Sequence, residues 1–381
     1  MEQASPQSAK SAVIAALLQR GQLSRSELAT ITGLSRAAIT DVTQHLLELG
    51  LFVEQRVAQP DAHRGRPAIL LSFQPAHACF VGISLGDTAT LMVLTDLQGR
   101  ILIRQPISRG KTPAEFTTAV RKGYMRILRE SGVPRSRVHG VGIAVSGIVD
   151  HVEGSCRYSA TLNWRDAPIS AMISKAMQLP AWVENDANSV AIGEKLFGNG
   201  REYRHFTTIA LDRTIGAAHY MHGMLYRGHD GGAGEIGHII VDPNGPLCPC
   251  GRNGCLDTIS SSIALQKTAQ EEGLAVTSMR ELESLAAHGN TKAIRILRRG
   301  GKVLGSTIAS LVQINNPQCI LFVDLEGFGN GVFWTATRQT IENEILPRFL
   351  SSTRIVLNEM KSGFLPRSAA SIAAFEYLKS L

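Results

Sequence analysis

Four potential metal ligands lie close together in the sequence, between residues 238 and 255. His238 precedes Cys248, Cys250 and Cys255, so three of the six cysteines fall within eight residues. A tetrahedral Zn²⁺ site takes four nitrogen or sulfur ligands and needs no redox chemistry. The glycines between these cysteines suit the tight turns that would aim three sulfurs at one centre. The spacing predicts a structural zinc with no open position for water; the alternative is a set of unrelated buried cysteines.

The composition is typical of a globular protein with a reduced interior. The 381 residues are 44% hydrophobic and 19% charged, enough for two or three domains. We see no apolar run that could span a bilayer, and the start MEQASPQSAK lacks signal-peptide features. Clustered cysteines favour metal over disulfides. We therefore expect a cytoplasmic protein with no membrane partner. The net charge of +7 permits an anionic partner without proving one.

Residues 1–76 have the pattern of a winged helix-turn-helix. The segment Ser24 to Glu27 is a capping box, which marks the start of a short helix between two longer ones. Helix, glycine turn and a longer helix with polar residues at its start is the order that places the last helix in the major groove. The expected helices cover 8–20, 24–32 and 35–49, and two strand-like segments, 51–55 and 68–73, would form the wing.

Two groups of side chains are candidates for DNA contact. The recognition helix offers Arg36, Ala37, Thr40, Thr43 and Gln44. The wing offers Arg64, Gly65 and Arg66, where glycine permits close approach and arginines suit a narrow minor groove. Residues 1–76 hold seven basic and six acidic side chains, so position argues for DNA more than net charge does. The alternative is a small helical dimerisation module with a solvated wing turn.

The remainder of the chain has an α/β pattern. Strand-like segments at 78–84, 89–95, 101–104 and 138–145 surround a helix at 112–131. A β-hairpin lobe followed by helix and strand resembles the opening of the two-lobed sugar kinase, hsp70 and actin fold, which is ribonuclease H-like.

Three motifs carry a more specific resemblance. They are ENDAN at 184–188, GEIGH at 234–238 and CPCGRNGCLD at 248–257. With the winged helix-turn-helix, the chain resembles the ROK family (repressors, open reading frames and sugar kinases) over essentially its whole length. The resemblance implies a DNA-binding domain at 1–76 and a ROK sugar-binding domain at 77–381. Lobe 1 would cover about 77–190 plus the last helix, and lobe 2, with the zinc site, about 191–365.

The resemblance also implies a set of sugar contacts. In family kinases the Asp of ENDAN takes a proton from the sugar hydroxyl, and this position is Asp186 here. The matching sugar contacts are Asn185, Glu235, His238 and Asp257, with Thr161 where the family commonly has Asn. Asp257 is one methylene shorter than the usual Glu. Polar groups of these types bind sugar hydroxyls and reject ligands that lack them. Taken alone, ENDAN is also typical of a polar turn that caps a helix.

The elements that would bind ATP depart from the family pattern. The first phosphate turn has Ser84 and Asp87 where the family has Asp and Gly, and the second begins Asp212-Arg213 where the family has Gly-Thr. Near the adenosine, the strand 319–323 is followed by Asp324-Leu325 in place of Gly-Gly. Family kinases hold phosphate with the backbone amides of such turns. Sugar and zinc motifs thus survive while all three nucleotide motifs are damaged.

The sequence therefore predicts a sugar-responsive transcriptional repressor without kinase activity. Its partners would be operator DNA, a sugar or sugar phosphate, and further copies of itself as a homodimer or homotetramer. One alternative is an active sugar kinase with a fused DNA-binding head, and another is a constitutive DNA binder with a vestigial sugar site. A long helix near 294–314 bears a basic face that we expect to be solvated or oligomer-facing: Lys292, Arg295, Arg298, Arg299 and Lys302.

Overall fold

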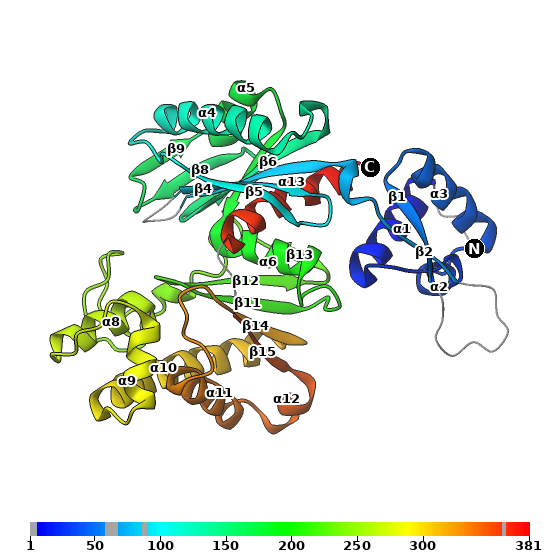
Figure 1. The fold of residues 1–381 in the computed structure, drawn as a ribbon. Coiled ribbons are helices and arrows are strands. Elements are labelled where there is room, and N and C mark those ends of the chain that lie inside the picture. The colour runs from blue at the N-terminus through cyan, green and yellow to red at the C-terminus, as the bar shows by residue number, and fades with distance from the viewer. Residues whose placement is uncertain (1–5, 58–67, 86–89, 360–362) are drawn as a thin grey trace. The chain divides into compact units, whose positions relative to one another are not determined.

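A computed structural model describes residues 6–57, 68–85, 90–359 and 363–381 (Figure 1). The chain forms two compact units: residues up to Glu202 together with Leu365–Leu381, and Tyr203–Phe364. The expected α/β class is confirmed, and each unit has its own five-stranded sheet. None of the helices in the described part of the chain has the length and apolar character that a bilayer crossing requires.

The N-terminal head has the order predicted for a winged helix-turn-helix. The capping box of the second helix is present, with Ser24 Oγ accepting from the Glu27 amide and the Glu27 carboxylate accepting from the Ser24 amide. The left-handed Gly33 (φ 70°) ends that helix, as only glycine does easily. The head consists of α1 (Pro6–Arg20), α2 (Arg25–Thr32) and α3 (Arg36–Glu48), followed by the antiparallel pair β1 (Phe52–Val57) and β2 (Ala68–Phe73).

The first unit continues as a mixed sheet covered by helices on both faces. Its strand order is β10-β6-β3-β4-β5, and the bounds are β3 (Cys79–Leu85), β4 (Thr90–Asp96), β5 (Ile101–Ile107), β6 (Val138–Val145) and β10 (Ala181–Asn185). A small sheet, β7 (Ile148–Asp150), β8 (Ser155–Ser159) and β9 (Trp164–Ala167), follows β6. One face packs on α4 (Pro113–Ser131) and α5 (Ile169–Met177).

The other face of this sheet receives α13 (Phe364–Ser380). Gly82 and Gly142 have no side chain because a Cβ at either position would collide with the carbonyl oxygens of Pro366 and Ala369, respectively. The last helix therefore returns to the first lobe, as predicted. Helix α6 (Asp186–Phe197) also belongs here, since its Gly193 lies against Ser368 of α13.

The boundary between the two compact units follows Glu202. A boundary near residue 191 would cut α6, whose middle is almost entirely buried. A continuous buried helix moves with the sheet it covers, so the first unit extends to Glu202. The division between head and body at residues 76 and 77 stays a prediction.

The second unit has the sheet order β13-β12-β11-β14-β15. Its strands are β11 (Phe206–Leu211), β12 (Ile215–Met221), β13 (Met224–Tyr226), β14 (Cys319–Asp324) and β15 (Arg354–Glu359). Its helices are α7 (Asp257–Ser260), α8 (Ser262–Glu271), α9 (Met279–Ala287), α10 (Thr291–Asn315), α11 (Val332–Glu344) and α12 (Pro347–Ser352). A single large core joins the central strands to these helices, with Phe322 and Phe333 among its fully buried side chains.

Candidate functional site

The four predicted metal ligands converge in the second unit. One ligand atom from each of His238, Cys248, Cys250 and Cys255 lies within 4.8 Å of the other three. His238 Nδ1 is 3.5 Å from Cys248 Sγ, and Cys250 Sγ is 3.6 Å from Cys255 Sγ. Ligands about 2.3 Å from a tetrahedral zinc would be about 3.7 Å apart. The spacing in the folded chain therefore fits a zinc ion.

The loop around the cysteines is held by close backbone contacts. Gly254 has φ +66°, and a Cβ there would collide with the Asp242 carbonyl oxygen. Its carbonyl accepts the amides of both Val241 and Asp242. A second contact is the bridge between Ile240 and Cys255. Glycine is thus required for the path that brings Cys255 back to His238.

The thiols of the cluster differ in their acidity. Backbone and side-chain hydrogen bonds from Arg252 lower the pKa of Cys250 to about 6. Burial, with hydrogen bonds and negative charge from the neighbouring thiols, raises the pKa of Cys255 to about 12. Three adjacent thiols repel one another's ionised forms, so a bound cation is what would let all of them ionise together.

His238 has one ring nitrogen on each side of this cluster. Nδ1 faces Cys248, while Nε2 lies 3.9 Å from a carboxylate oxygen of Glu235. A ligating imidazole is commonly oriented by such a second partner. The geometry agrees with a histidine that binds metal through Nδ1 and directs Nε2 toward the acidic residues beside it.

Those acidic residues are two of the predicted sugar contacts. Burial raises the pKa of Glu235 and raises that of Asp257 to about 6. Both carboxylates lie close to His238, and the positive charge of a protonated His238 lowers both pKa values in part. Asp257 Oδ1 also accepts the Ile215 amide at 2.6 Å. The second unit therefore brings together three of the six predicted sugar residues.

The other three lie in the first unit. Asn185 caps helix α6: its Oδ1 accepts the Asn188 amide at 3.2 Å and its Nδ2 donates to the Gly147 carbonyl at 3.0 Å. The helix-capping interpretation of ENDAN is therefore correct for Asn185, whatever else the motif does. Asp186 is the first residue of the helix and is half-buried. Thr161 is exposed in the turn between β8 and β9.

The loop after β14 shows a feature that the sequence did not predict. The buried Asp324 carboxylate accepts four backbone amides in a row. They are those of Glu326, Gly327, Phe328 and Gly329, at 2.7–3.2 Å. A ring of amides around one anion is the arrangement that binds phosphate in nucleotide sites. Here the side chain of Asp324 fills this ring of amides. The sequence signal for it was an Asp followed three residues later by Gly-Phe-Gly.

The second turn has a related arrangement. Asp212 Oδ1 accepts the Arg213 amide at 2.8 Å, and the Ile215 amide is bonded to Asp257. Carboxylates of the chain thus accept hydrogen bonds from backbone amides in this turn as well. Ser84 is buried at the end of β3, and Asp87 lies outside the described residues.

The head corrects one predicted DNA contact. Thr43 is fully buried on the same face of α3 as Ile39 and Leu46, so the expectation that it contacts DNA is wrong. Its hydroxyl donates to the Thr40 carbonyl at 3.2 Å and accepts from Arg25 Nε at 3.0 Å. The remaining recognition-helix residues are exposed: Arg36, Ala37, Thr40 and Gln44. Arg64, Gly65 and Arg66 lie outside the described residues.

The fold and these sites together define a class: a winged helix-turn-helix joined to an actin-like body with a Cys₃His cluster. The ROK family model matches residues 80–346, and the chain belongs to this family. The xylose repressor of Bacillus spizizenii is 27% identical, covering 89% of this chain and 88% of its own length. The glucokinase of Thermotoga maritima is 27% identical over 77% of this chain and 96% of its own.

A solved structure matches almost the whole chain. It is a ROK family transcriptional regulator described as a homolog of the E. coli MLC protein, with a TM-score of 0.81 and 25% identity. The match covers 98% of each chain, including the head. The two relatives that match most of the chain are thus described as a repressor and a transcriptional regulator, whereas the glucokinase matches a smaller part of this chain.

Proposed function

We propose that this protein is a sugar-responsive transcriptional repressor that holds a structural zinc and has no kinase activity. The observation that carries the proposal is the state of the phosphate-binding loops. Asp324 and Asp257 accept backbone amides of the two loops in the second unit that kinases of this family use for ATP. A bound phosphate would have to displace like-charged carboxylates, which is unfavourable at close range.

Operator DNA would be bound by the head. Helix α3 would enter the major groove with the exposed residues near its N-terminus, Arg36, Ala37 and Thr40, and with Gln44 one turn further on. Arg64, Gly65 and Arg66 of the wing would reach the minor groove. Two heads in a homodimer, or four in a homotetramer, would read half-sites about 34 Å apart in the cytoplasm.

The effector would be a sugar or sugar phosphate. Asn185, Asp186 and Thr161 would contribute from the first unit, and Glu235, His238 and Asp257 from the second. These side chains offer carboxylate, amide and imidazole groups suited to sugar hydroxyls. Zinc on His238 and the three cysteines would fix the imidazole, and with four protein ligands it would have no position left for catalysis.

Helix α6 gives a route from the effector to the head. The helix begins at Asn185 and Asp186 and is buried along nearly its whole length. Just beyond its C-terminal end, Glu202 forms a 3.1 Å ion pair with Arg20 at the end of α1. The Arg201 guanidinium lies near Gly21, the residue that follows the end of α1. A buried helix shifts as one body, so a displacement of Asp186 would be transmitted through α6 to α1.

The test is DNA-binding anisotropy on the protein's own upstream region, repeated across a panel of sugars and sugar phosphates. We expect one sugar to weaken binding at least tenfold. Asp186→Asn should bind DNA as the wild type does but lose the response. No sugar-dependent change in affinity, together with no thermal shift with any sugar, would instead favour a constitutive DNA binder.

A second candidate function is an active sugar kinase. It is favoured by Asp186 at the start of α6, the position of the base in family kinases, and by the similarity to a glucokinase. Incubation with ATP, Mg²⁺ and the sugar panel separates the two candidates. Product formation that disappears in Asp186→Asn would overturn the repressor-only proposal.

A further inference from the structure

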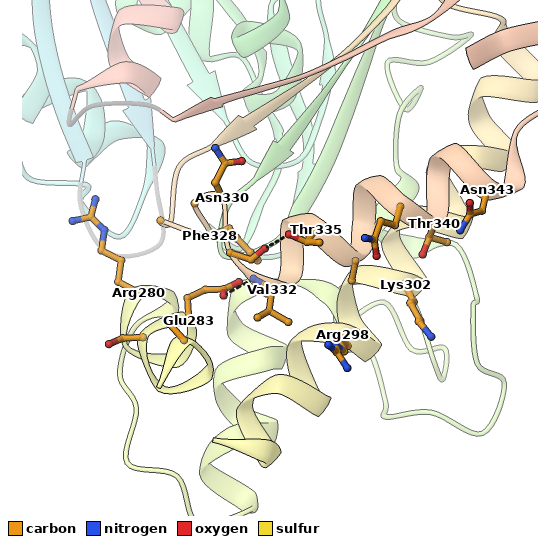
Figure 2. A pocket seen from close by; sticks show the side chains of 17 residues that line it. Arg280, Glu283, Arg298, Lys302, Phe328, Asn330, Val332, Thr335, Thr340 and Asn343 are labelled. Carbon is orange, nitrogen blue, oxygen red and sulfur yellow. Dashed lines mark hydrogen bonds between the residues drawn. The ribbon is translucent and has the colours of Figure 1, made fainter. Parts of the chain in front are cut away.

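A large cavity in the second unit shares no residue with the zinc cluster or the predicted sugar contacts. Its volume is about 1000 Å³, which is large enough for a metabolite. The walls are α9, α10, α11 and the loop that joins β14 to α11 (Figure 2). Lining residues on α11 run from Val332 to Asn343, which corresponds to about 16 Å of helix.

Three cations line the cavity, and none of them has an ionic partner among the residues that the structure describes. Arg280 comes from α9, and Arg298 and Lys302 come from α10. None of these three forms a hydrogen bond or ion pair with a residue that the structure describes. In the view of Figure 2, Arg280 lies on one side of the cavity and the other two lie across from it. Charges from separate elements therefore face one space.

The neighbouring cations of α10 behave differently. Lys292 donates to the Glu272 carbonyl, Arg295 pairs with the Glu272 carboxylate, and Arg299 lies 3.4 Å from Asp242. Two of these three cations are thus paired with carboxylates, whereas Arg298 and Lys302 form no ion pair with a residue that the structure describes.

The acidic groups at the cavity are already engaged by backbone amides. Glu283 is the acidic residue among the described residues that line the cavity, and its two oxygens accept the Val332 and Phe333 amides at 2.8 and 2.9 Å. It caps α11, where a negative charge is stabilised by the helix dipole. Asp324, beneath the loop, is engaged by four amides as described above. Both carboxylates keep their negative charge, so a phosphate can bind only at the ends of the cavity, where the three cations outweigh that charge.

The loop is glycine-rich where these side chains cross it. A Cβ on Gly327 (φ +83°) would lie 2.8 Å from Arg280 Nε, and one on Gly331 would collide with the Glu283 carboxylate. These two glycines therefore let the Arg280 and Glu283 side chains lie directly against the loop backbone. Further along, the amides of Asn330, Gln339 and Asn343 add hydrogen-bonding groups.

We propose that this cavity binds a small organic phosphate, with Arg280 on one side and Arg298 and Lys302 on the other. Guanidinium groups pair with phosphate through two hydrogen bonds, and lysine adds a point charge. The cavity is too long for one inorganic phosphate to reach both sides. A metabolite with a phosphate at each end fits the charge arrangement better than one with a single phosphate.

The test is calorimetric titration of the full chain with fructose 1,6-bisphosphate, glucose 6-phosphate and inorganic phosphate as probes. We expect the bisphosphate to bind most tightly and inorganic phosphate least. Arg298→Ala with Lys302→Ala should weaken the bisphosphate at least tenfold. Both side chains are exposed, so the variant should fold. Arg338→Ala on α11 is the matched control, because Arg338 is exposed, pairs with Glu342 and does not line the cavity.

The result is separable from the sugar response. Asp186→Asn should leave bisphosphate binding unchanged, so failure of the sugar-sensor proposal would not affect this one. The proposal is overturned if no phosphate probe binds at millimolar concentration, or if the double variant binds like Arg338→Ala. Binding of ATP alone, or of an acidic peptide but no phosphate ester, would also overturn it.

Discussion

Two regions of the second unit differ in whether the chain itself fills the centre at which its polar groups point. Around His238, the donor atoms of four ligands point at a common centre that a cation would complete. In the loop after β14, four backbone amides point at a common centre that the chain already fills with Asp324. The first arrangement needs something from outside the chain, whereas the second is complete by itself.

The difference suggests how a kinase body can be kept as a sensor. Replacing glycines in a phosphate loop weakens nucleotide binding, but it leaves amides that must still be satisfied when buried. Carboxylates from Asp324, Asp212 and Asp257 take these amides over. The loops thus keep their shape without a nucleotide, and they can support the side chains proposed to bind zinc and sugar.

The zinc region should be the more fragile of the two. Cys250→Ala removes one of four ligands, and we expect loss of stoichiometric zinc and about 4 kcal/mol of stability. Metal analysis with chemical unfolding measures both. Cys79→Ala, buried outside the cluster, should keep its zinc and lose only about 1 kcal/mol. If Cys250→Ala also retained a normal sugar response, the link between metal and effector pocket would be refuted.

Asp324→Ala tests whether the filled loop supports itself. Four amides would lose their acceptor, and we expect the free energy of unfolding to fall by about 3 kcal/mol. Asp324→Asn keeps one acceptor oxygen and should lose less. Urea unfolding with an unchanged m-value is the measurement. A variant as stable as the wild type, or one that gained ATP turnover, would contradict a self-supporting loop.

Acid should weaken the sheet beside the zinc region through His219. Burial lowers the pKa of His219 to about 4, and its Nδ1 accepts the Asn315 amide while lying 3.0 Å from Thr207 Oγ1. Below pH 6.5 the unfolded chain binds a proton that the folded chain does not, so stability falls as pH drops from 6.5 toward 4. We expect about 2 kcal/mol of this loss by pH 5.

The measurement is urea unfolding at pH 7 and pH 5, for the wild type and for His219→Gln. The variant lacks a titrating ring, so its pH dependence should be smaller by that amount. Equal pH dependence in both proteins would show that His219 is protonated in the folded state.

Asp257 lies beside His238 and also accepts a backbone amide, as Asp324 does, so it gives the smallest and most specific test. Its carboxylate accepts the Ile215 amide and lies against Gly237, where a Cβ would be 2.9 Å from the carboxyl carbon. Asp257→Glu adds one methylene in this narrow space, and we expect a cost of about 1 kcal/mol and a changed sugar preference. Thermal shifts across a sugar panel measure both. An unchanged sugar preference would show that Asp257 supports the turn at Ile215 and does not contact the sugar.

Much of the fold could be predicted because its signals are local. Capping boxes, glycine stops and apolar periodicity predicted the helices of the head, the paired wing strands and the long helix α10. Short strands had weaker signals: β7, β8 and β9 were not predicted, because three to five residues carry little periodicity. The extent of the first unit, to Glu202, depends on where α6 is buried, which local patterns do not show.

By itself, the sequence determined the class of the protein and predicted the four side chains that cluster around His238, because three cysteines within eight residues can meet only by local turns. It also determined which nucleotide motifs were altered. Only the tertiary structure decided what replaced the phosphate contacts of these motifs, because the role of Asp324 depends on four amides that fold back around its carboxylate. Burial likewise decided that Thr43 supports the head from inside, and packing of α9, α10 and α11 decided which cations share a cavity. These outcomes depend on contacts between segments, which spacing along the chain does not encode.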